Sequence, residues 1–186
     1  MSSHFSIIMK RFALVTSVLT ILFAAAYRIS PRGWILSGAI TVGTTAYHLL
    51  MRLAVGSLLP KLTNYDFDHR SLWFRSKTWE PAFYQKLQVK RWKGKLPTYA
   101  PSQFSLTEQT LLRVIQNMCG AELVHEIIMV LSFLPLLAVP AWGEFYVFLI
   151  TSLSAALFDS IFVMAQRYNR PRLVRIYERQ EAKMRE

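Results

Sequence analysis

Apolar runs alternate with stretches rich in lysine and arginine along the chain. Four of these runs approach the roughly 20 residues that a helix needs to cross about 30 Å of hydrocarbon. They cover residues 12–27, 33–59, 122–139 and 142–164. The alternation of apolar and polar positions that a membrane β-barrel needs is absent. The pattern therefore predicts an all-α fold, a polytopic membrane helix bundle with about four transmembrane helices.

The first apolar run has two interpretations. The pair Lys10-Arg11 precedes it and three alanines, residues 24–26, lie at its end, which is the order of a cleavable signal peptide. The second run begins directly after the short segment 28–32. This short spacing favours a hairpin of two retained helices.

Residues 60–121 are predicted to form a basic amphipathic insert. They are not a linker, because they hold three of the five tryptophans and few glycines. Thr78 is placed to cap a helix whose first turn contains Glu80 and Pro81. The apolar residues at helical spacing along this helix are Trp79, Phe83 and Leu87. The pattern is typical of a helix at the membrane interface, and a helix packed on the protein's own spans fits it equally.

Two further boundaries follow from local signals. Ser105 and Glu108 form the S-x-x-E pattern of a capping box, which predicts the start of another helix. Pro171 disfavours the helical conformation at Arg170, so the chain is predicted to turn there. The basic C-terminal tail covers residues 165–186.

The composition limits the class of protein. The chain has 22 Lys and Arg against 11 Asp and Glu, a net charge of +11, yet only 18% of its residues are charged and 53% are hydrophobic. Soluble domains average about 25% charged residues, so a disordered chain and a soluble basic nucleic-acid-binding domain are both excluded. The single cysteine, Cys119, excludes an internal disulfide and a cysteine-based zinc site.

The cations are distributed unevenly. Ten lie between residues 60 and 121 and seven follow residue 164, whereas residues 28–32 have two and residues 140–141 have none. The positive-inside rule then places the insert and both termini in the cytoplasm. We predict a single integral membrane domain over residues 1–186, multi-pass, in the cell membrane, with the lipid bilayer as partner and no nucleic-acid partner.

One acidic and histidine-containing motif suits proton transfer. Glu122, His125 and Glu126 share one helix face at the start of the third apolar run. An imidazole beside a carboxylate is a general base for a hydroxyl. The E-x-x-H spacing also occurs in di-iron bundles, which need a second such motif that this chain lacks, so no metal is expected. A third interpretation is that these residues only mark the end of the span.

Ionisable residues also occur inside the second apolar run. His48 and Arg52 lie one helical turn apart there, and such residues usually face a cavity or a partner. Asp159 lies at about the same depth in the fourth run and is the predicted partner of Arg52. Snorkelling of Arg52 to the cytoplasmic side is the alternative.

The most polar stretch follows the fourth run, at residues 166–172. Three guanidiniums on a turn would form a phosphate site, because each presents two parallel donors. A simple positive-inside anchor accounts for the cations but has no need of Tyr168 and Asn169. The stretch reads Gln166-Arg167-Tyr168-Asn169-Arg170-Pro171-Arg172.

Several segments taken together match a known pattern. They are Arg75-x-x-x-Trp79-Glu80, Tyr84-x-x-x-x-x-Lys90-Arg91-Trp92-Lys93-x-x-Leu96-Pro97, Ala121-Glu122-Leu123-Val124-His125, and the polar stretch at 166–172 with Leu173. Over roughly residues 75–173 the chain resembles the glycosyl-4,4'-diaponeurosporenoate acyltransferase (CrtO) family of bacterial carotenoid biosynthesis. The resemblance implies a membrane enzyme that esterifies a sugar hydroxyl of a glycosylated carotenoid acid with a fatty acyl group.

We therefore predict transfer of an acyl group from a thioester donor, acyl-CoA or acyl carrier protein, to a hydroxyl of a glycosylated carotenoid or similar glycolipid. His125 is the predicted base and Glu122 its orienting partner. No bound cofactor is expected. Cys119 is a covalent alternative, and a methyl or hydride donor is a further one. A different class of function is a non-catalytic membrane subunit that organises lipid- or carotenoid-modifying enzymes.

The two substrates are predicted to meet in one cytoplasm-facing pocket, with an apolar groove leading from it between the spans. Arg167, Arg170 and Arg172 would hold phosphates of the donor. The other predicted binding residues are Tyr168, Asn169 and Asp159, with Trp92 and Lys93 of the insert as the roof.

Overall fold

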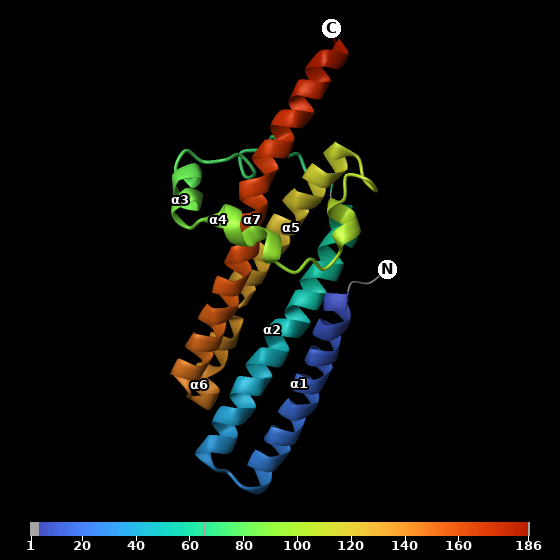
Figure 1. Cartoon of the computed structure of the whole chain (residues 1–186). Helices are drawn as coiled ribbons and strands as arrows, with labels where there is room; N and C mark the ends of the chain where they lie inside the picture. The colour runs from blue at the N-terminus through green and yellow to red at the C-terminus, as the bar shows by residue number, and fades with distance from the viewer. Residues whose placement is uncertain (1–3, 65, 186) are drawn as a thin grey trace. The chain divides into compact units, whose positions relative to one another are not determined.

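The computed structural model describes residues 4–64 and 66–185, and within them the chain is helical without strands (Figure 1). Helix accounts for 81% of the structure, which confirms the all-α prediction. The α-helices are α1 (His4–Ile29), α2 (Gly33–Thr63), α3 (Glu80–Lys86), α4 (Val89–Trp92), α5 (Leu111–Leu131), α6 (Val139–Trp142) and α7 (Phe145–Arg185). Three 3-10 helices lie between them, η1 (Lys93–Lys95), η2 (Pro101–Phe104) and η3 (Leu134–Ala138).

Within the described residues, three helical stretches are long and apolar enough to cross a membrane, so the chain is a membrane protein. They are His4–Ile29, Leu111–Trp142 and Phe145–Arg185. The helix α2 is long enough, but threonines, glycines, His48 and Arg52 interrupt its apolar character. A fourth crossing by α2 stays a prediction.

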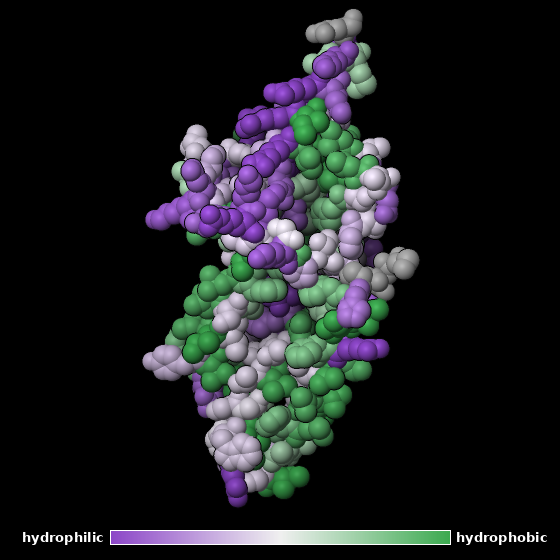
Figure 2. Space-filling model, in the orientation of Figure 1, coloured by the Kyte–Doolittle hydropathy of each residue, from purple (hydrophilic) through white to green (hydrophobic). Residues whose placement is uncertain are grey.

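The chain forms two compact units. Unit 1 consists of Met1–Ser57 and Ile127–Asp159, and unit 2 consists of Leu58–Glu126 and Ser160–Glu186. Hydrophobic side chains cover α1 in unit 1, whereas hydrophilic side chains cover the C-terminal part of α7 in unit 2 (Figure 2). Unit 2 therefore combines the predicted insert with the basic C-terminal segment.

Glycines let two helices of unit 1 approach closely. A Cβ on Gly38 of α2 would lie 2.8 Å from the ring of Phe23 in α1, and one on Gly43 would lie 3.2 Å from Thr20. Small residues at such positions allow close helix packing in membranes, where backbones gain from direct contact. The contact between α1 and α2 is the helical hairpin that the short segment 28–32 favours.

The helices α2 and α7 run parallel in unit 1. Ser37 donates a hydrogen bond of 3.0 Å to Glu144, and Arg52 pairs with Asp159 through an Nε–Oδ2 distance of 3.1 Å. Both pairs are separated by 107 residues, so the two helices keep a constant register between them.

The predicted turn at Pro171 is wrong, whereas the predicted third run, 122–139, lies within a stretch that is able to span a membrane. The helix α7 continues through Pro171 to Arg185, so there is no turn at that proline. The helix α5 runs from Leu111 to Leu131, and 3-10 and short α-helical turns replace a regular helix up to residue 139. At Pro171 the long-range contacts of the neighbouring arginines outweigh a local cost of about 3 kcal/mol for proline inside a helix.

The predicted helix caps of the insert are also wrong. The N-cap of α3 is Trp79 rather than Thr78, although Glu80 and Pro81 do form its first turn. Ser105 caps no α-helix, because its Oγ accepts from the nearby Thr107 N at 3.3 Å. The role at the start of α5 belongs to Thr110, whose Oγ1 accepts from Arg113 N at 3.3 Å. A left-handed residue, Gln88 with φ +52°, separates α3 from α4.

Candidate functional site

Two carboxylates and two guanidiniums form a buried network in unit 2. Arg167 donates to Glu122 Oε1 at 2.6 Å and to Glu80 Oε1 at 2.6 Å from Nη2 and 2.9 Å from Nε. Arg170 donates to the second oxygen of Glu122. Glu122 is 0% exposed, and Glu80 and Arg170 are each 2% exposed. The charges balance, which a buried ionic network requires.

Three segments hold this network in place. Arg167 and Arg170 lie at i and i+3 on α7 and so face the same side, while Glu122 belongs to α5 and Glu80 begins α3. The guanidiniums also bind the backbone of residues 73–75. Arg170 donates to the carbonyl of Phe74 at 2.5 Å, and Arg167 donates to the carbonyls of residues 73 and 75 at 3.3 and 3.1 Å. The network thus joins α3, its preceding loop, α5 and α7.

The predicted base lies one turn after Glu122. The His125 ring stacks on Phe162 of α7, with centroids 4.7 Å apart and planes 10° from parallel. Both oxygens of Glu122 accept from arginines, so this carboxylate belongs to the network, and its orientation of His125 stays a prediction. Glu126 accepts from the indole Nε1 of Trp73 at 2.8 Å. The E-x-x-H face is therefore divided among three different partners.

The three arginines that are predicted to bind the donor phosphates also have different surroundings. Arg167 and Arg170 face internal carboxylates, and burial leaves Arg170 without an exposed surface for a phosphate. Their assignment as phosphate ligands on a turn does not fit this geometry. Arg172 differs, because it is exposed and its Nη2 donates to Tyr168 Oη at 2.9 Å.

Four of the predicted binding residues do meet in unit 2. Lys93 Nζ donates to Asn169 Oδ1 and lies 5.0 Å from the centroid of the Tyr168 ring. The guanidinium carbon of Arg172 lies 4.8 Å from the same ring. Burial, and after it the positive charges of Arg172 and Lys90, lower the pKa of Lys93. The indole Nε1 of Trp92 instead donates to the carbonyl of Leu87 at 3.0 Å.

Two residues of the network region were missing from the predicted site. The sequence predicts Glu80 only as part of a helix start, and it predicts no separate role for Tyr84. Tyr84 is buried, and its ring lies 6.1 Å from the Tyr168 ring. Burial and the negative charge of Glu80 raise the pKa of Tyr84 to about 12. The sequence signal for both was their place in the family-like segments at 79–84.

A polar cavity of about 410 Å³ occupies another part of unit 2. The Nε2 atom of His69 is buried there and finds no hydrogen-bond partner among the described residues. The cavity is lined by Asp66, Phe67, Asp68, His69, Arg70, Leu112, Gln116, Tyr177 and Glu181. His69 is thus a second histidine of unit 2 whose Nε2 is available for proton transfer.

Asp159 lies in unit 1 and pairs with Arg52, as the sequence predicted. Its side chain is 0% exposed and that of Arg52 is 15% exposed. Arg52 also donates to the carbonyl of Ala155 at 3.3 Å. The pair satisfies two ionised groups inside apolar surroundings, and a substrate-binding role for Asp159 stays a prediction.

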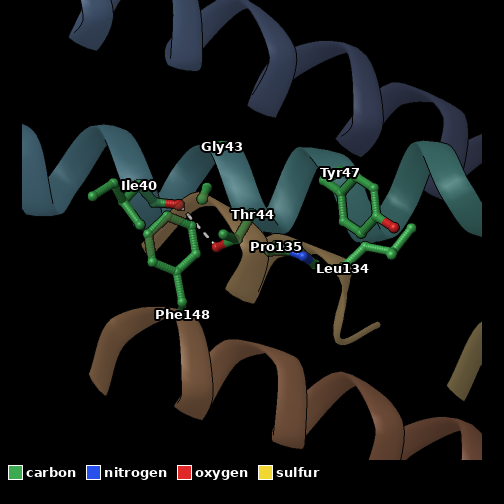
Figure 3. A pocket seen from close by; sticks show the side chains of 8 residues that line it. Ile40, Gly43, Thr44, Tyr47, Leu134, Pro135 and Phe148 are labelled. Atoms are coloured by element: carbon green, nitrogen blue, oxygen red, sulfur yellow. Dashed lines mark hydrogen bonds between the residues drawn. The ribbon is translucent and has the colours of Figure 1, made fainter. Parts of the chain in front are cut away.

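Unit 1 contains an apolar cavity of about 310 Å³ (Figure 3). Its few polar groups are satisfied internally, since Thr44 donates to the carbonyl of Ile40 at 2.8 Å and Tyr47 donates to that of Leu131 at 2.8 Å. Such a surface suits a hydrocarbon chain. The cavity is lined by Ile40, Gly43, Thr44, Tyr47, Leu134, Pro135, Ala138 and Phe148.

Within residues 4–64 and 66–185, no group of three or more His, Cys, Asp or Glu side chains is placed to hold a metal ion. Cys119 is buried and forms no disulfide, as expected of the single cysteine of the sequence. The two carboxylates of the buried network are instead paired with arginines.

Comparison with curated proteins and with solved structures finds no match. A family model described as glycosyl-4,4'-diaponeurosporenoate acyltransferase (CrtO) matches residues 69–179. The match includes all four residues of the buried network and also His69 and His125. Because it covers more than half of the chain, this protein belongs to the CrtO family and is an acyltransferase of carotenoid-related biosynthesis.

Proposed function

We propose that the enzyme transfers a fatty acyl group from a thioester donor to a sugar hydroxyl of a glycosylated carotenoid or similar glycolipid at the membrane. The observation that carries this proposal is the position of His125, one turn from the buried network within the region that matches the family. The cell membrane, with both termini in the cytoplasm, is the location that the charge distribution supports.

His125 is the proposed general base. Its imidazole takes the proton of the acceptor hydroxyl as the hydroxyl oxygen attacks the thioester carbonyl. The carbon–sulfur bond then breaks, and the imidazolium returns the proton to the leaving thiolate. Stacking on Phe162 fixes the plane of the ring, which favours a reproducible geometry for proton transfer. No acyl-enzyme is needed, and burial of Cys119 argues against a thiol nucleophile.

The network supplies position rather than chemistry in this proposal. Arg167 and Arg170 are neutralised by Glu80 and Glu122, so they leave no net charge for a substrate. Their contacts hold α5 and α7 together beside His125. A base is effective only when such a supporting framework keeps it close to the reacting hydroxyl.

The test compares two histidines of the same unit. Purified enzyme receives labelled palmitoyl-CoA, or palmitate on a carrier protein, together with a glycosylated carotenoid. His125→Ala is expected to lower kcat by roughly 10²-fold or more, while His69→Ala measures the loss from removing the other histidine. Folded His125→Ala protein with near-normal turnover would remove His125 from the mechanism, and a selective loss in His69→Ala would transfer the role to that residue.

The same assay addresses the alternative of a non-catalytic organising subunit, which the family assignment disfavours. Product formation by the purified chain alone supports the enzyme. Absence of product with every donor and acceptor, from protein that remains folded, would support the organising role.

A further inference from the structure

The continuation of α7 past Pro171 creates a one-sided row of cations in unit 2. Arg172, Arg175, Arg179 and Lys183 recur at intervals of three and four residues, so they lie along one face of the helix. We call these four residues the basic stripe, and all four are exposed. Hydrophilic side chains cover this part of α7 in Figure 2.

The acidic residues of the same segment occupy other faces. Glu181 accepts from Arg70 at 2.8 Å and from Tyr177 at 2.9 Å, within unit 2. No ion pair between described residues includes a member of the basic stripe. The stripe therefore offers several cations that the described chain leaves without a carboxylate.

Like charges also converge at the start of the stripe. Lys93 and Arg172 both lie about 5 Å from the centroid of one ring, that of Tyr168. The ring faces offset part of the repulsion through cation–π attraction. Burial, Arg172 and Lys90 together lower the pKa of Lys93. An anion bound here would relieve a repulsion that the protein itself does not neutralise.

The direction of the stripe indicates the kind of anion. The apolar run of α7 ends at Met164, so Arg172 lies ~12 Å and Lys183 ~28 Å farther along the helix axis. Each headgroup layer of a bilayer is only roughly 5–8 Å thick. The stripe therefore extends beyond the headgroups. The stripe also lies on the exposed face of a helix, which is a convex surface, whereas small molecules such as nucleotides bind in concave sites.

We propose that the basic stripe is the docking surface for an acidic acyl carrier protein that delivers the acyl group. This proposal rests on the proposed acyl transfer and chooses between its two classes of donor. A carrier protein presents a row of carboxylates on a folded surface, which complements cations spaced over three helical turns. The charges contribute mainly to encounter and orientation, because they remain exposed to water.

The experiment uses the full chain in lipid nanodiscs and two double variants. Arg175→Gln/Arg179→Gln removes two stripe cations, and Lys77→Gln/Arg185→Gln removes two exposed cations outside the stripe. Both variants therefore have the same net charge. Each is assayed with palmitoyl carrier protein and with palmitoyl-CoA, and the Kd of labelled palmitoyl carrier protein is measured separately from turnover.

The stripe variant is expected to raise KM and Kd for the carrier protein roughly tenfold and to leave kcat, and KM for palmitoyl-CoA, unchanged. Added salt should weaken wild-type binding to the carrier protein and affect the stripe variant less. The control variant should behave as the wild type does.

Equal effects of the two double variants would overturn the proposal. A similar rise in KM for palmitoyl-CoA would assign the stripe to nucleotide phosphates, and selective loss of binding to phosphatidylglycerol vesicles would assign it to headgroups. If wild-type enzyme transfers acyl groups from neither donor, the proposed function fails. The Kd comparison still decides whether the stripe binds the carrier protein.

Discussion

Removal of the central carboxylate of the network should destabilise the protein strongly. In Glu122→Gln, Arg167 and Arg170 keep their charges while only Glu80 remains ionised to compensate them. Glu122 is 0% exposed and Arg170 is 2% exposed, so water does not replace the lost charge. Breaking a buried ion pair by removing one partner costs about 3–5 kcal/mol. We expect a loss of that size in the free energy of unfolding.

The control lies one turn farther along α5. Glu126 is only partly buried and accepts a single hydrogen bond of 2.8 Å from Trp73. A glutamine retains an acceptor oxygen for that bond, so Glu126→Gln should cost about 1 kcal/mol or less. The two variants carry the same chemical change on the same helix. Their difference therefore isolates the contribution of burial and of the two arginines.

Reversible unfolding in mixed micelles, followed by tryptophan fluorescence, provides the measurement. A third variant, Glu122→Leu/Arg170→Met, removes one charge of each sign and leaves the pair of Arg167 and Glu80 balanced. It should recover much of the stability, because apolar replacement of a buried pair is often neutral. Equal stability of Glu122→Gln and Glu126→Gln would refute the argument that the network is buried and mutually dependent.

Three further outcomes follow from the structure. Asp159→Asn leaves Arg52 without its counter-ion and should cost about 3–5 kcal/mol by the same micelle assay, with a loss under 1 kcal/mol counting against the buried pair. Pro171→Ala should raise stability by up to about 3 kcal/mol, because it restores an N–H to a continuous helix; a decrease would indicate a turn. Tyr84 should titrate near pH 12 in an absorbance titration, with that step absent in Tyr84→Phe. Its folded pKa exceeds the usual 10.0, so the unfolded chain loses this proton first and stability should fall between pH 10 and about 12.

Hydropathy and spacing predicted the helical class, three stretches that are able to span a membrane and the pairing of Arg52 with Asp159, because these depend on local composition and depth. Pro171 shows where a local rule fails. Its cost in a helix is small compared with the contacts that Arg167 and Arg170 gain when helical spacing places both on Glu122. Sequence patterns describe the cost but contain no measure of that gain.

The division of the E-x-x-H face has a similar explanation. Glu122 and His125 share a face in any helix, so the sequence predicts them as a pair. Which partner each one meets depends on α3 and α7, which are distant in sequence. Glu80 lies 87 residues from Arg167 and Glu122 lies 45 residues from it. Only folding determines that two arginines meet on the carboxylate of Glu122.

The number of membrane spans also depends on contacts that a sequence pattern does not contain, and α2 is the example. It is not among the helices that are apolar enough to span by hydropathy, yet most of its polar groups are satisfied within unit 1; the buried ring nitrogens of His48 are the exception among the described residues. Threonine hydroxyls donate to carbonyls one turn earlier, Ser37 donates to Glu144, and Arg52 pairs with Asp159. A hydropathy scale assigns each of these groups the cost of an unsatisfied one.

The constant register between α2 and α7 therefore predicts that α2 crosses the membrane. Ser37 contacts Glu144, the residue directly before α7, and Arg52 contacts Asp159 of α7, at two levels ~22 Å apart along the axis of α2. The part of α7 between these levels belongs to a helix that is able to span. A helix that follows α7 in parallel over that distance shares most of its path through hydrocarbon. Cysteines introduced at Ser30 and at Lys61 should then react with an impermeant maleimide from opposite sides of a sealed vesicle, while the buried Cys119 stays unlabelled. Labelling of both from one side would show that α2 does not cross, and would leave three spans.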